Sequence, residues 1–229
     1  MPALLETVAA QAVAPAANSM AQRVQPCTVC HGREGRATNA GYFPRIAGKP
    51  AEYLYAQLLN FRDGRRQNAA MQGLIDTLSD DYLRQIAEHF AALDLPYPPP
   101  LPLLPAQASA AALLRGEALV LMGDRTRGVP ACASCHGAVM TGVVSASMPA
   151  VPGLLGLPRD YLMAQLGAWR TGLRKATAPD CMAQVATRLS PDDLSAVATW
   201  LAAQPVPVDA KPVARTAGPL PLDCGRRLP

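Results

Sequence analysis

Aromatic residues and charged residues are both scarce in this chain of 229 residues. Phe, Trp and Tyr make up 5% of the sequence and charged side chains 17%, whereas half of the residues are hydrophobic. A chain of this length can build two domains of about a hundred residues each. So few large side chains favour small helical domains whose cores are completed by something other than aromatic rings.

Long apolar runs are also absent. No stretch approaches the roughly 18 consecutive apolar residues that a membrane-spanning helix needs. We therefore expect no transmembrane segment, although peripheral association with a membrane stays open. Residues 1–6 also lack the basic region that begins an export signal.

Cysteine and histidine are few, and most of them fall into two short motifs. The chain has six Cys and three His, and the motifs are Cys27-Thr28-Val29-Cys30-His31 and Cys132-Ala133-Ser134-Cys135-His136. Each is C-x-x-C-H followed by Gly, which is typical of covalent c-type haem attachment. The two thiols, one helical turn apart, can reach both vinyl groups of a porphyrin. His31 or His136 then lies beneath the ring, where it can bind iron. The sequence predicts two haem c groups.

A single C-x-x-C motif also occurs in redox-active dithiols and in halves of zinc sites. Zinc would need both pairs to share one metal ion, or further ligands that the chain barely supplies, so haem is the stronger interpretation. Two haems bring four propionates, about −4 in charge when ionised. This charge offsets the formal net charge of +4, and we expect no nucleic-acid partner.

The two halves of the sequence repeat each other. His31 recurs as His136 after 105 residues, and Pro44 recurs as Pro149. The later matches are separated by 108 and then 111 residues: Tyr53 and Tyr161, Gln57 and Gln165, Arg62 and Arg170, Met71 and Met182, Ser79 and Ser190. A shift that grows only by small insertions is the mark of an internal duplication.

Apolar spacing and capping residues predict an all-α protein. We expect haem domains at residues 18–95 and 108–203. Residues 96–107, rich in Pro, should form an extended linker between them. An Ala-rich lead-in is expected at 1–17, and a Pro-rich basic tail at 204–229 is either disordered or draped over a domain.

A haem iron bound by His on one side has either an open position or a second axial ligand. Met71 and Met182 match between the halves, each seven residues before an aligned Leu-Ser pair. We expect both to be sixth ligands. A thioether favours ferrous iron, raises the potential and closes the iron to substrates. Such sites carry electrons, so we expect no catalytic residues.

Two further pairs could support the haems. The carbonyls of Pro44 and Pro149 could accept the N–H of the ligand imidazoles and so strengthen them as donors. Arg62 and Arg170 could bind haem propionates, and it is equally plausible that they are exposed charges at helix ends.

Cys181 and Cys224 lie outside the motifs. They could form a disulfide that ties the tail across the second domain in an oxidising compartment, or remain separate thiols. A third alternative is that Cys181, next to Met182, binds iron as a thiolate and lowers the potential.

These features resemble the dihaem cytochromes c of the cytochrome c4 family. The resemblance covers about residues 20–95 and 108–203. It rests on Cys-x-x-Cys-His-Gly, Pro-x-x-x-Gly, the Tyr-Leu-x-x-Gln-Leu helix, the Arg-x-Gly turn and Met before Leu-Ser. Gly128-Val129-Pro130-Ala131-Cys132 is similar to that family's second haem site. The resemblance implies two tandem cytochrome c-type haem domains related by pseudo-twofold symmetry, with propionates facing the interface.

The resemblance also implies a function. Members pass single electrons in the bacterial periplasm from a quinol-oxidising complex or a dehydrogenase to a terminal oxidase. The alternative is a dedicated cytochrome subunit of a periplasmic dehydrogenase or respiratory complex, because the tail and the extra thiols depart from the family. A dihaem enzyme, such as a peroxidase or a thiosulfate-oxidising cytochrome, needs an open position or Cys ligation. We expect a periplasmic carrier whose export signal is not visible in this numbering.

Overall fold

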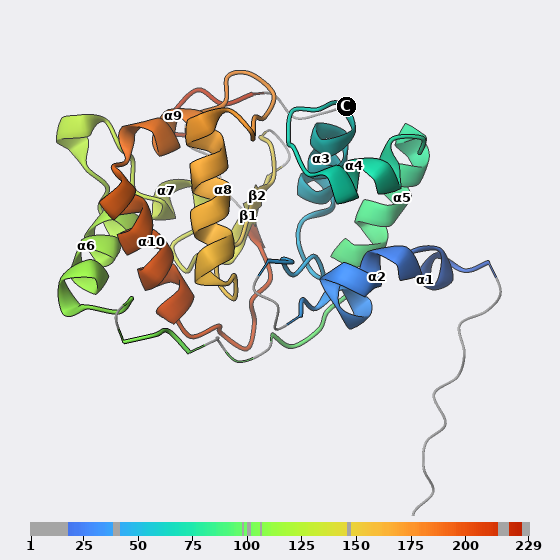
Figure 1. The fold of residues 1–229 in the computed structure, drawn as a ribbon, viewed down its shortest axis with the longest axis horizontal. Helices are drawn as coiled ribbons and strands as arrows, with labels where there is room; N and C mark the ends of the chain where they lie inside the picture. Colours follow the sequence, from blue (N-terminus) through green and yellow to red (C-terminus); the bar gives the residue numbers. More distant parts are fainter. Residues whose placement is uncertain are drawn as a thin grey trace, which may run out of the picture.

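The computed structural model describes residues 18–38, 42–97, 99, 102–105, 107–145, 148–214 and 220–225. Within these residues the helices form two groups, one from each half of the chain, that lie side by side (Figure 1). The expected lead-in at 1–17 lies outside the described residues, as do parts of the linker and the tail. The two groups agree with the predicted all-α fold.

The first group is built around a pair of packed helices. Its helices are α1 (Met20–Arg23), α2 (Gln25–His31), α3 (Ala51–Arg62), α4 (Ala69–Ile75) and α5 (Asp80–Ala91). Ser79 begins α5 as predicted, because its side chain accepts the N–H of Tyr82. Leu83 and Phe90 of α5 are fully buried in a core shared with α3.

The second group repeats this plan, and its first helix is longer. Its helices are α6 (Ala110–Leu121), α7 (Ala133–His136), α8 (Arg159–Thr171), α9 (Cys181–Arg188) and α10 (Pro191–Ala203). At the start of α10, the side chain of Ser190 accepts the Asp193 N–H while the Asp193 carboxylate accepts the Ser190 N–H. This capping box satisfies two backbone donors that a helix start leaves unpaired.

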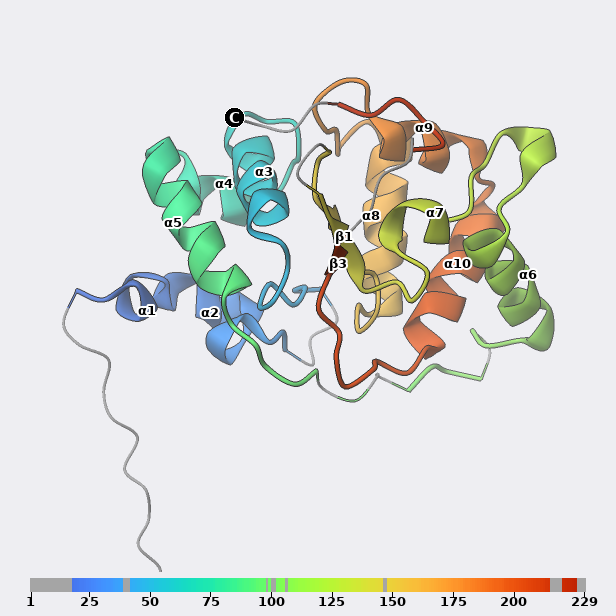
Figure 2. The ribbon, with the colours of Figure 1, turned by 180° about the vertical axis from the view of Figure 1, so that it is seen from behind.

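A small sheet, which the sequence analysis did not anticipate, adds the tail to the second group. Strand β1 (Gly142–Val144) pairs antiparallel with β2 (Val151–Pro152) and parallel with β3 (Val213–Ala214) (Figure 2). Because β3 belongs to the tail, the described part of the tail is draped over the protein, one of the two alternatives predicted for it.

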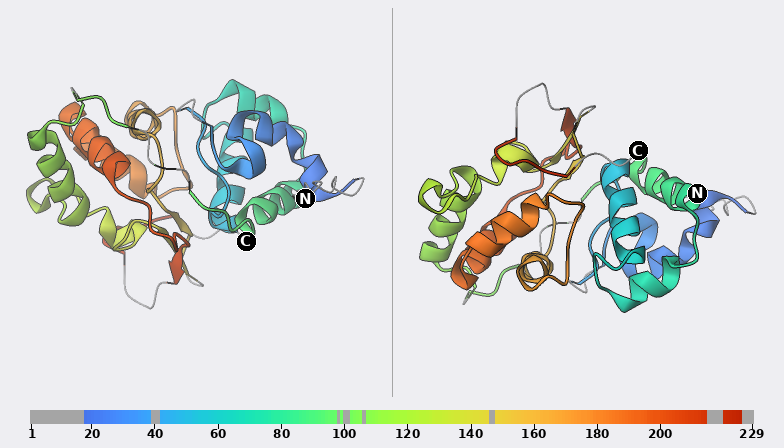
Figure 3. Two further views of the ribbon diagram at one scale, coloured as in Figure 1. Left: turned by 90° about the horizontal axis from the view of Figure 1, so that it is seen from below. Right: turned by 90° about the horizontal axis from the view of Figure 1, so that it is seen from above.

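The duplication is visible in the structure. Equivalent helices α3 and α8 follow Pro50 and Pro158, which lie 108 residues apart. Arg66 and Arg174, also 108 apart, pair with each other in an isolated antiparallel bridge. A residue that pairs with its own equivalent lies on an approximate twofold axis between the two groups of helices, which Figure 3 shows side by side.

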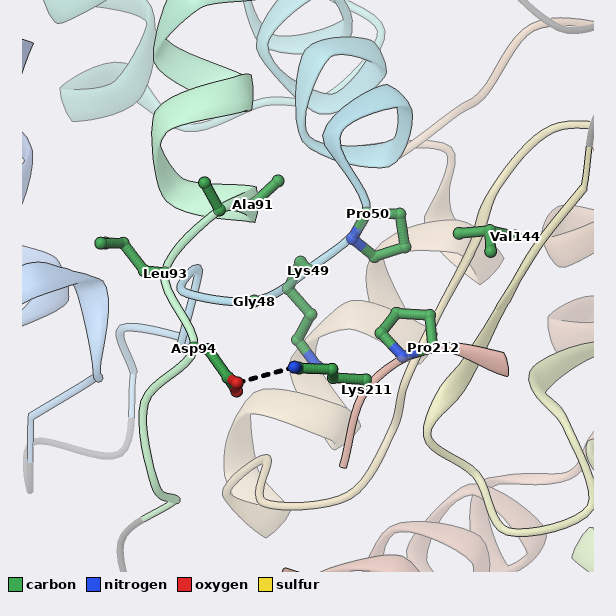
Figure 4. A pocket seen from close by; sticks show the side chains of 10 residues that line it. Gly48, Lys49, Pro50, Ala91, Leu93, Asp94, Val144, Lys211 and Pro212 are labelled. Atoms are coloured by element: carbon green, nitrogen blue, oxygen red, sulfur yellow. Dashed lines mark ion pairs between the residues drawn. The ribbon is translucent and has the colours of Figure 1, made fainter. Parts of the chain in front are cut away.

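The tail also contacts the first group. Lys211 forms an ion pair with Asp94 at 2.7 Å, at the edge of a cavity of about 400 Å³ (Figure 4). Lys49 lines the same cavity, and its Nζ donates a 2.9 Å hydrogen bond to the carbonyl of Gly153 in the second group. Burial lowers the pKa of Lys49 to about 8. Through β3 and Lys211, the tail therefore contacts both halves of the chain.

Helices α6 and α10 approach closely at Gly116, where a Cβ atom would lie 2.2 Å from the carbonyl oxygen of Ala196. We expect Gly116→Ala to lower the free energy of unfolding by about 1–3 kcal/mol, since the helices must separate. Gly167→Ala is the matched control, because a Cβ at Gly167 in α8 meets nothing within 4 Å. It should be neutral or stabilise by up to about 1 kcal/mol. Denaturant unfolding compares the two; equal stabilities would contradict the close packing.

The described helices are short. The longest, α8 and α10, have 13 residues each, and within the described part of the chain none is long and apolar enough to cross a bilayer.

Candidate haem sites

Each C-x-x-C-H motif ends a helix on a buried histidine. His31 closes α2 and His136 closes α7, and the glycine after each has a positive φ, 76° at Gly32 and 88° at Gly137. At Gly32 a Cβ would lie 2.2 Å from the carbonyl oxygen of Ala37. This close approach explains why glycine follows the histidine.

Both histidine rings are oriented by a backbone carbonyl. His31 Nδ1 donates to the carbonyl of Pro44 and His136 Nδ1 donates to that of Pro152, both at 2.8 Å. This bond leaves Nε2 of each ring as the nitrogen available to iron. Burial lowers the pKa of both imidazoles, which favours the neutral form that binds a metal.

The prediction that Pro149 plays this part in the second site is wrong. The carbonyl that accepts the His136 N–H belongs to Pro152, 108 residues after Pro44, so the insertion in the second half lies before this proline. Gly48 accordingly matches Gly156, with φ values of 72° and 70°. Pro149 matched Pro44 at a shift of 105 because the inserted segment itself contains a proline.

The environment of Cys27 and Cys132, the first cysteine of each motif, argues against the alternatives to haem. Burial raises the pKa of Cys27, and it raises that of Cys132 to about 11, whereas redox-active dithiols lower it. Within the described ranges no three Cys, His, Asp or Glu side chains converge as ligands of a metal ion. The structure therefore favours neither a redox dithiol nor a shared zinc ion.

Met71 and Met182 each lie in a short helix, Met71 in α4 and Met182 in α9. Met71 packs partly buried against the same core as Cys27, and Met182 against the same core as Cys132. Asn68 caps α4 by accepting the N–H of Met71, whereas Asp180 caps α9 by accepting that of Ala183. Relative to its cap, Met182 therefore sits one residue earlier than Met71.

Cys181 and Cys224 form a disulfide, one of the three alternatives that the sequence left open. The bond holds the tail against the start of α9, where the N–H of Gly225 also donates to the carbonyl of Pro179 at 2.8 Å. Because the sulfur of Cys181 is committed to this bond, thiolate ligation of iron by Cys181 is ruled out in this structure.

The contacts of Arg62 and Arg170 do not support the idea that they bind propionates. Arg62 donates to the carbonyl of Leu78 at 3.2 Å and to Asp80 at 2.6 Å. Arg170 makes the equivalent bond to the carbonyl of Leu189. Both guanidinium groups thus fasten the end of one helix to the start of the final helix of their domain.

Two other arginines, Arg66 and Arg174, occupy the interface between the halves. Arg66 reaches across to Tyr161 at 2.9 Å and Gln165 at 2.7 Å. Arg174 reaches back to Gln57 at 2.9 Å and to Tyr53. The sequence analysis recorded the tyrosine and glutamine repeats but overlooked these arginines, although they recur at the same shift of 108.

This arginine pair places two positive charges in a buried interface. Arg66 is 8% exposed and Arg174 is 5% exposed, and no ion pair joins either to a carboxylate within the described residues. Burial lowers the pKa of Arg174, and so does the charge of Arg66 beside it. Buried cations normally need an anion nearby. Carboxylates of haem propionates would meet that need, so the interface fits the propionates of two haems.

Each helical domain contains one C-x-x-C-H motif, and the histidine of each motif is buried and oriented by a backbone carbonyl. These features define a dihaem c-type cytochrome. No family model matches the sequence. The thiosulfate dehydrogenase electron acceptor of Thiomonas intermedia is 40% identical over 79% of this chain and 79% of its own length. Cytochrome c4 of Pseudomonas aeruginosa is 34% identical over 76% and 82%.

Solved structures agree with this. Reduced cytochrome c4 from Pseudomonas stutzeri superposes with a TM-score of 0.63 at 29% identity, covering 79% of this chain and 94% of that one. Thiosulfate dehydrogenase from Marichromatium purpuratum gives 0.66 at 33% identity, covering 78% of this chain but 36% of that one. This chain belongs to the cytochrome c4 family. It carries two covalently bound haem c groups and serves as an electron carrier, not as a catalytic enzyme.

Proposed function

We propose that this cytochrome is the electron acceptor of a thiosulfate dehydrogenase and hands the electrons to a further redox protein in the periplasm. The observation that carries the proposal is the 40% identity, over 79% of both chains, to a relative named for that role. A second relative with the same name, from Stutzerimonas stutzeri, is 38% identical over 77% of both chains. The electron donor in this proposal is thus a dehydrogenase, one of the two kinds of donor that the family resemblance implied.

In this proposal eight side chains hold the haems. The thioether bonds form at Cys27, Cys30, Cys132 and Cys135, and the axial ligands are His31, Met71, His136 and Met182. Each haem, when bound, takes up and releases one electron. The carbonyls of Pro44 and Pro152 hold the two imidazoles in place, and a methionine on the opposite side excludes substrates from the iron.

Arg66 and Arg174 contribute the link between the two sites. Their hydrogen bonds cross the interface in both directions, so they would hold haems bound in the two halves at a constant separation. A rigid, buried interface of this kind keeps the protein from reorganising when an electron passes between the halves. The disulfide of Cys181 and Cys224 suits an oxidising compartment such as the periplasm.

Rapid mixing tests the donor. The oxidised holoprotein is mixed with a thiosulfate dehydrogenase and thiosulfate, and haem reduction is followed by absorbance. We expect reduction far faster than with thiosulfate alone, and faster than that of an unrelated c-type cytochrome of similar potential. A rate no greater than with thiosulfate alone would contradict the proposal.

A free-running carrier between a quinol-oxidising complex and a terminal oxidase is the second candidate. It is favoured by the relatives named cytochrome c4, at 29–34% identity. The same experiment with a quinol-oxidising complex in place of the dehydrogenase separates the two, because only the true donor should reduce the protein rapidly. Oxidation by terminal-oxidase membranes then tests the acceptor in either case.

A further inference from the structure

We propose that the indole N–H of Trp169 donates a hydrogen bond to a propionate of the second haem and raises the reduction potential of that haem. The corresponding residue of the first half, 108 positions earlier, is Phe61, which has no such donor. The two sites of the duplication would therefore differ in potential through one side chain. This inference depends on the haems and not on the identity of the electron donor.

The position of Trp169 places its ring at the interface between the halves. Tyr161, Gln165 and Trp169 are spaced four residues apart on α8, so they form one stripe along the helix. Tyr161 and Gln165 both accept hydrogen bonds from Arg66 of the first half. Trp169 therefore continues the row of side chains that faces the first domain.

Arg174 determines which part of the indole can take a partner. Its Cζ lies 3.8 Å from the centroid of the Trp169 ring, in a cation–π contact. Arg66 stacks in the same way on Phe61, at 4.4 Å. The arginine covers one face of each ring, so a hydrogen-bond acceptor for the indole must approach at its edge, next to the guanidinium.

The indole nitrogen is the unusual atom. Trp169 Nε1 is buried and has no hydrogen-bond partner within the part of the chain that the structure describes. Buried donors are almost always paired, because an unpaired one costs about 1–3 kcal/mol. A carboxylate is the acceptor that suits this position best, because it would accept the N–H and lie beside the Arg174 cation. The propionate of the haem bound by His136 has that chemistry.

The sign of the effect follows from charge. An ionised propionate stabilises ferric haem, which carries one more positive charge than ferrous haem, and so lowers the potential. The indole N–H directs the positive end of its dipole at the propionate and offsets part of that field. Removing the donor should therefore lower the potential of the second haem and leave the first unchanged.

The test is Trp169→Phe, which gives the second site the residue that the first already has. Redox titration of the holoprotein, resolved for each haem by paramagnetic NMR, should show the electron distribution between the haems shifting toward the first by up to about tenfold. A tenfold shift corresponds to about 59 mV for a one-electron couple. An unchanged distribution, or an equal shift of both haems, would overturn the proposal.

The other tryptophan provides the matched control. The chain has two Trp residues, and Trp200 on α10 packs against the core of the second domain. Trp200→Phe should leave both potentials unchanged; a shift equal to that of Trp169→Phe would mean that loss of packing is the cause. In the reduced protein labelled with ¹⁵N-tryptophan, the Trp169 indole proton should exchange slowly with solvent. Rapid exchange would also contradict the hydrogen bond.

Discussion

Replacing Met182 with alanine should remove about half of the weak near-infrared absorption that Met sulfur gives on ferric haem. The thioether stabilises the ferrous state, so the potential of the second haem should fall by on the order of a hundred millivolts or more. The first haem should keep its band, because Met71 belongs to the other core. Absorption of the oxidised holoprotein and a redox titration measure both effects.

Met163 supplies the control for this experiment. It also packs partly buried against the core of the second domain, so Met163→Ala removes a similar side chain without removing the proposed ligand. Its near-infrared band should stay intact. Met71→Ala should mirror Met182→Ala at the first haem. A full band in Met182→Ala would show that Met182 is not the sixth ligand. The one-residue offset of Met182 relative to its helix cap would then be the structural difference that explains this result.

Loss of the disulfide should have the second large effect. Cys181 and Cys224 are 43 residues apart in sequence, and the chain-entropy estimate for a loop of that size is about 4 kcal/mol. We expect the double variant Cys181→Ser with Cys224→Ser to lose roughly that much unfolding free energy in the second domain. Denaturant unfolding of the oxidised holoprotein, followed at the haem absorbance, measures it.

The same variant tests whether the tail helps to hold the sixth ligand. Met182 directly follows Cys181, so release of the tail should weaken the band of the second haem and leave that of the first unchanged. The single variant Cys224→Ser leaves a thiol at Cys181 that can bind iron, and it serves as the comparison. If the double variant unfolds like the unaltered protein, the disulfide contributes nothing to stability and the tail is held by contacts such as those of β3, Lys211 and Gly225.

Most of what the sequence predicted correctly rests on local chemistry. The C-x-x-C-H motifs imply two haems because thiols and imidazole must lie within one helical turn of each other. Ser79 and Ser190 mark helix starts because the hydroxyl of each accepts the N–H of the residue three positions later in the chain. The regular shift between matching residues of the two halves revealed the duplication and, with it, the cytochrome c4 family.

The failures came where contacts join distant parts of the chain. Pro149 matched Pro44 by letter, but the carbonyl that meets His136 belongs to Pro152, because only the path of the inserted loop decides which residue arrives there. For Arg62 and Arg170 the sequence left two roles open, and only the structure shows their guanidinium groups bonded at the final helix of their own domain. Repetition showed that these positions matter without showing what they touch.

The sequence by itself therefore determined the cofactor motifs, the two helical repeats and the electron-carrier class, since each can be read from short motifs and from their repetition along the chain. The tertiary structure alone decided three further features. It paired Arg66 with Arg174 across the interface, joined the tail to β1 and α9, and buried an indole N–H beside a cation. The first two features join residues from 43 to more than 100 positions apart, and the third depends on how deeply the Trp169 ring is enclosed. Only the tertiary fold decides such contacts and such burial.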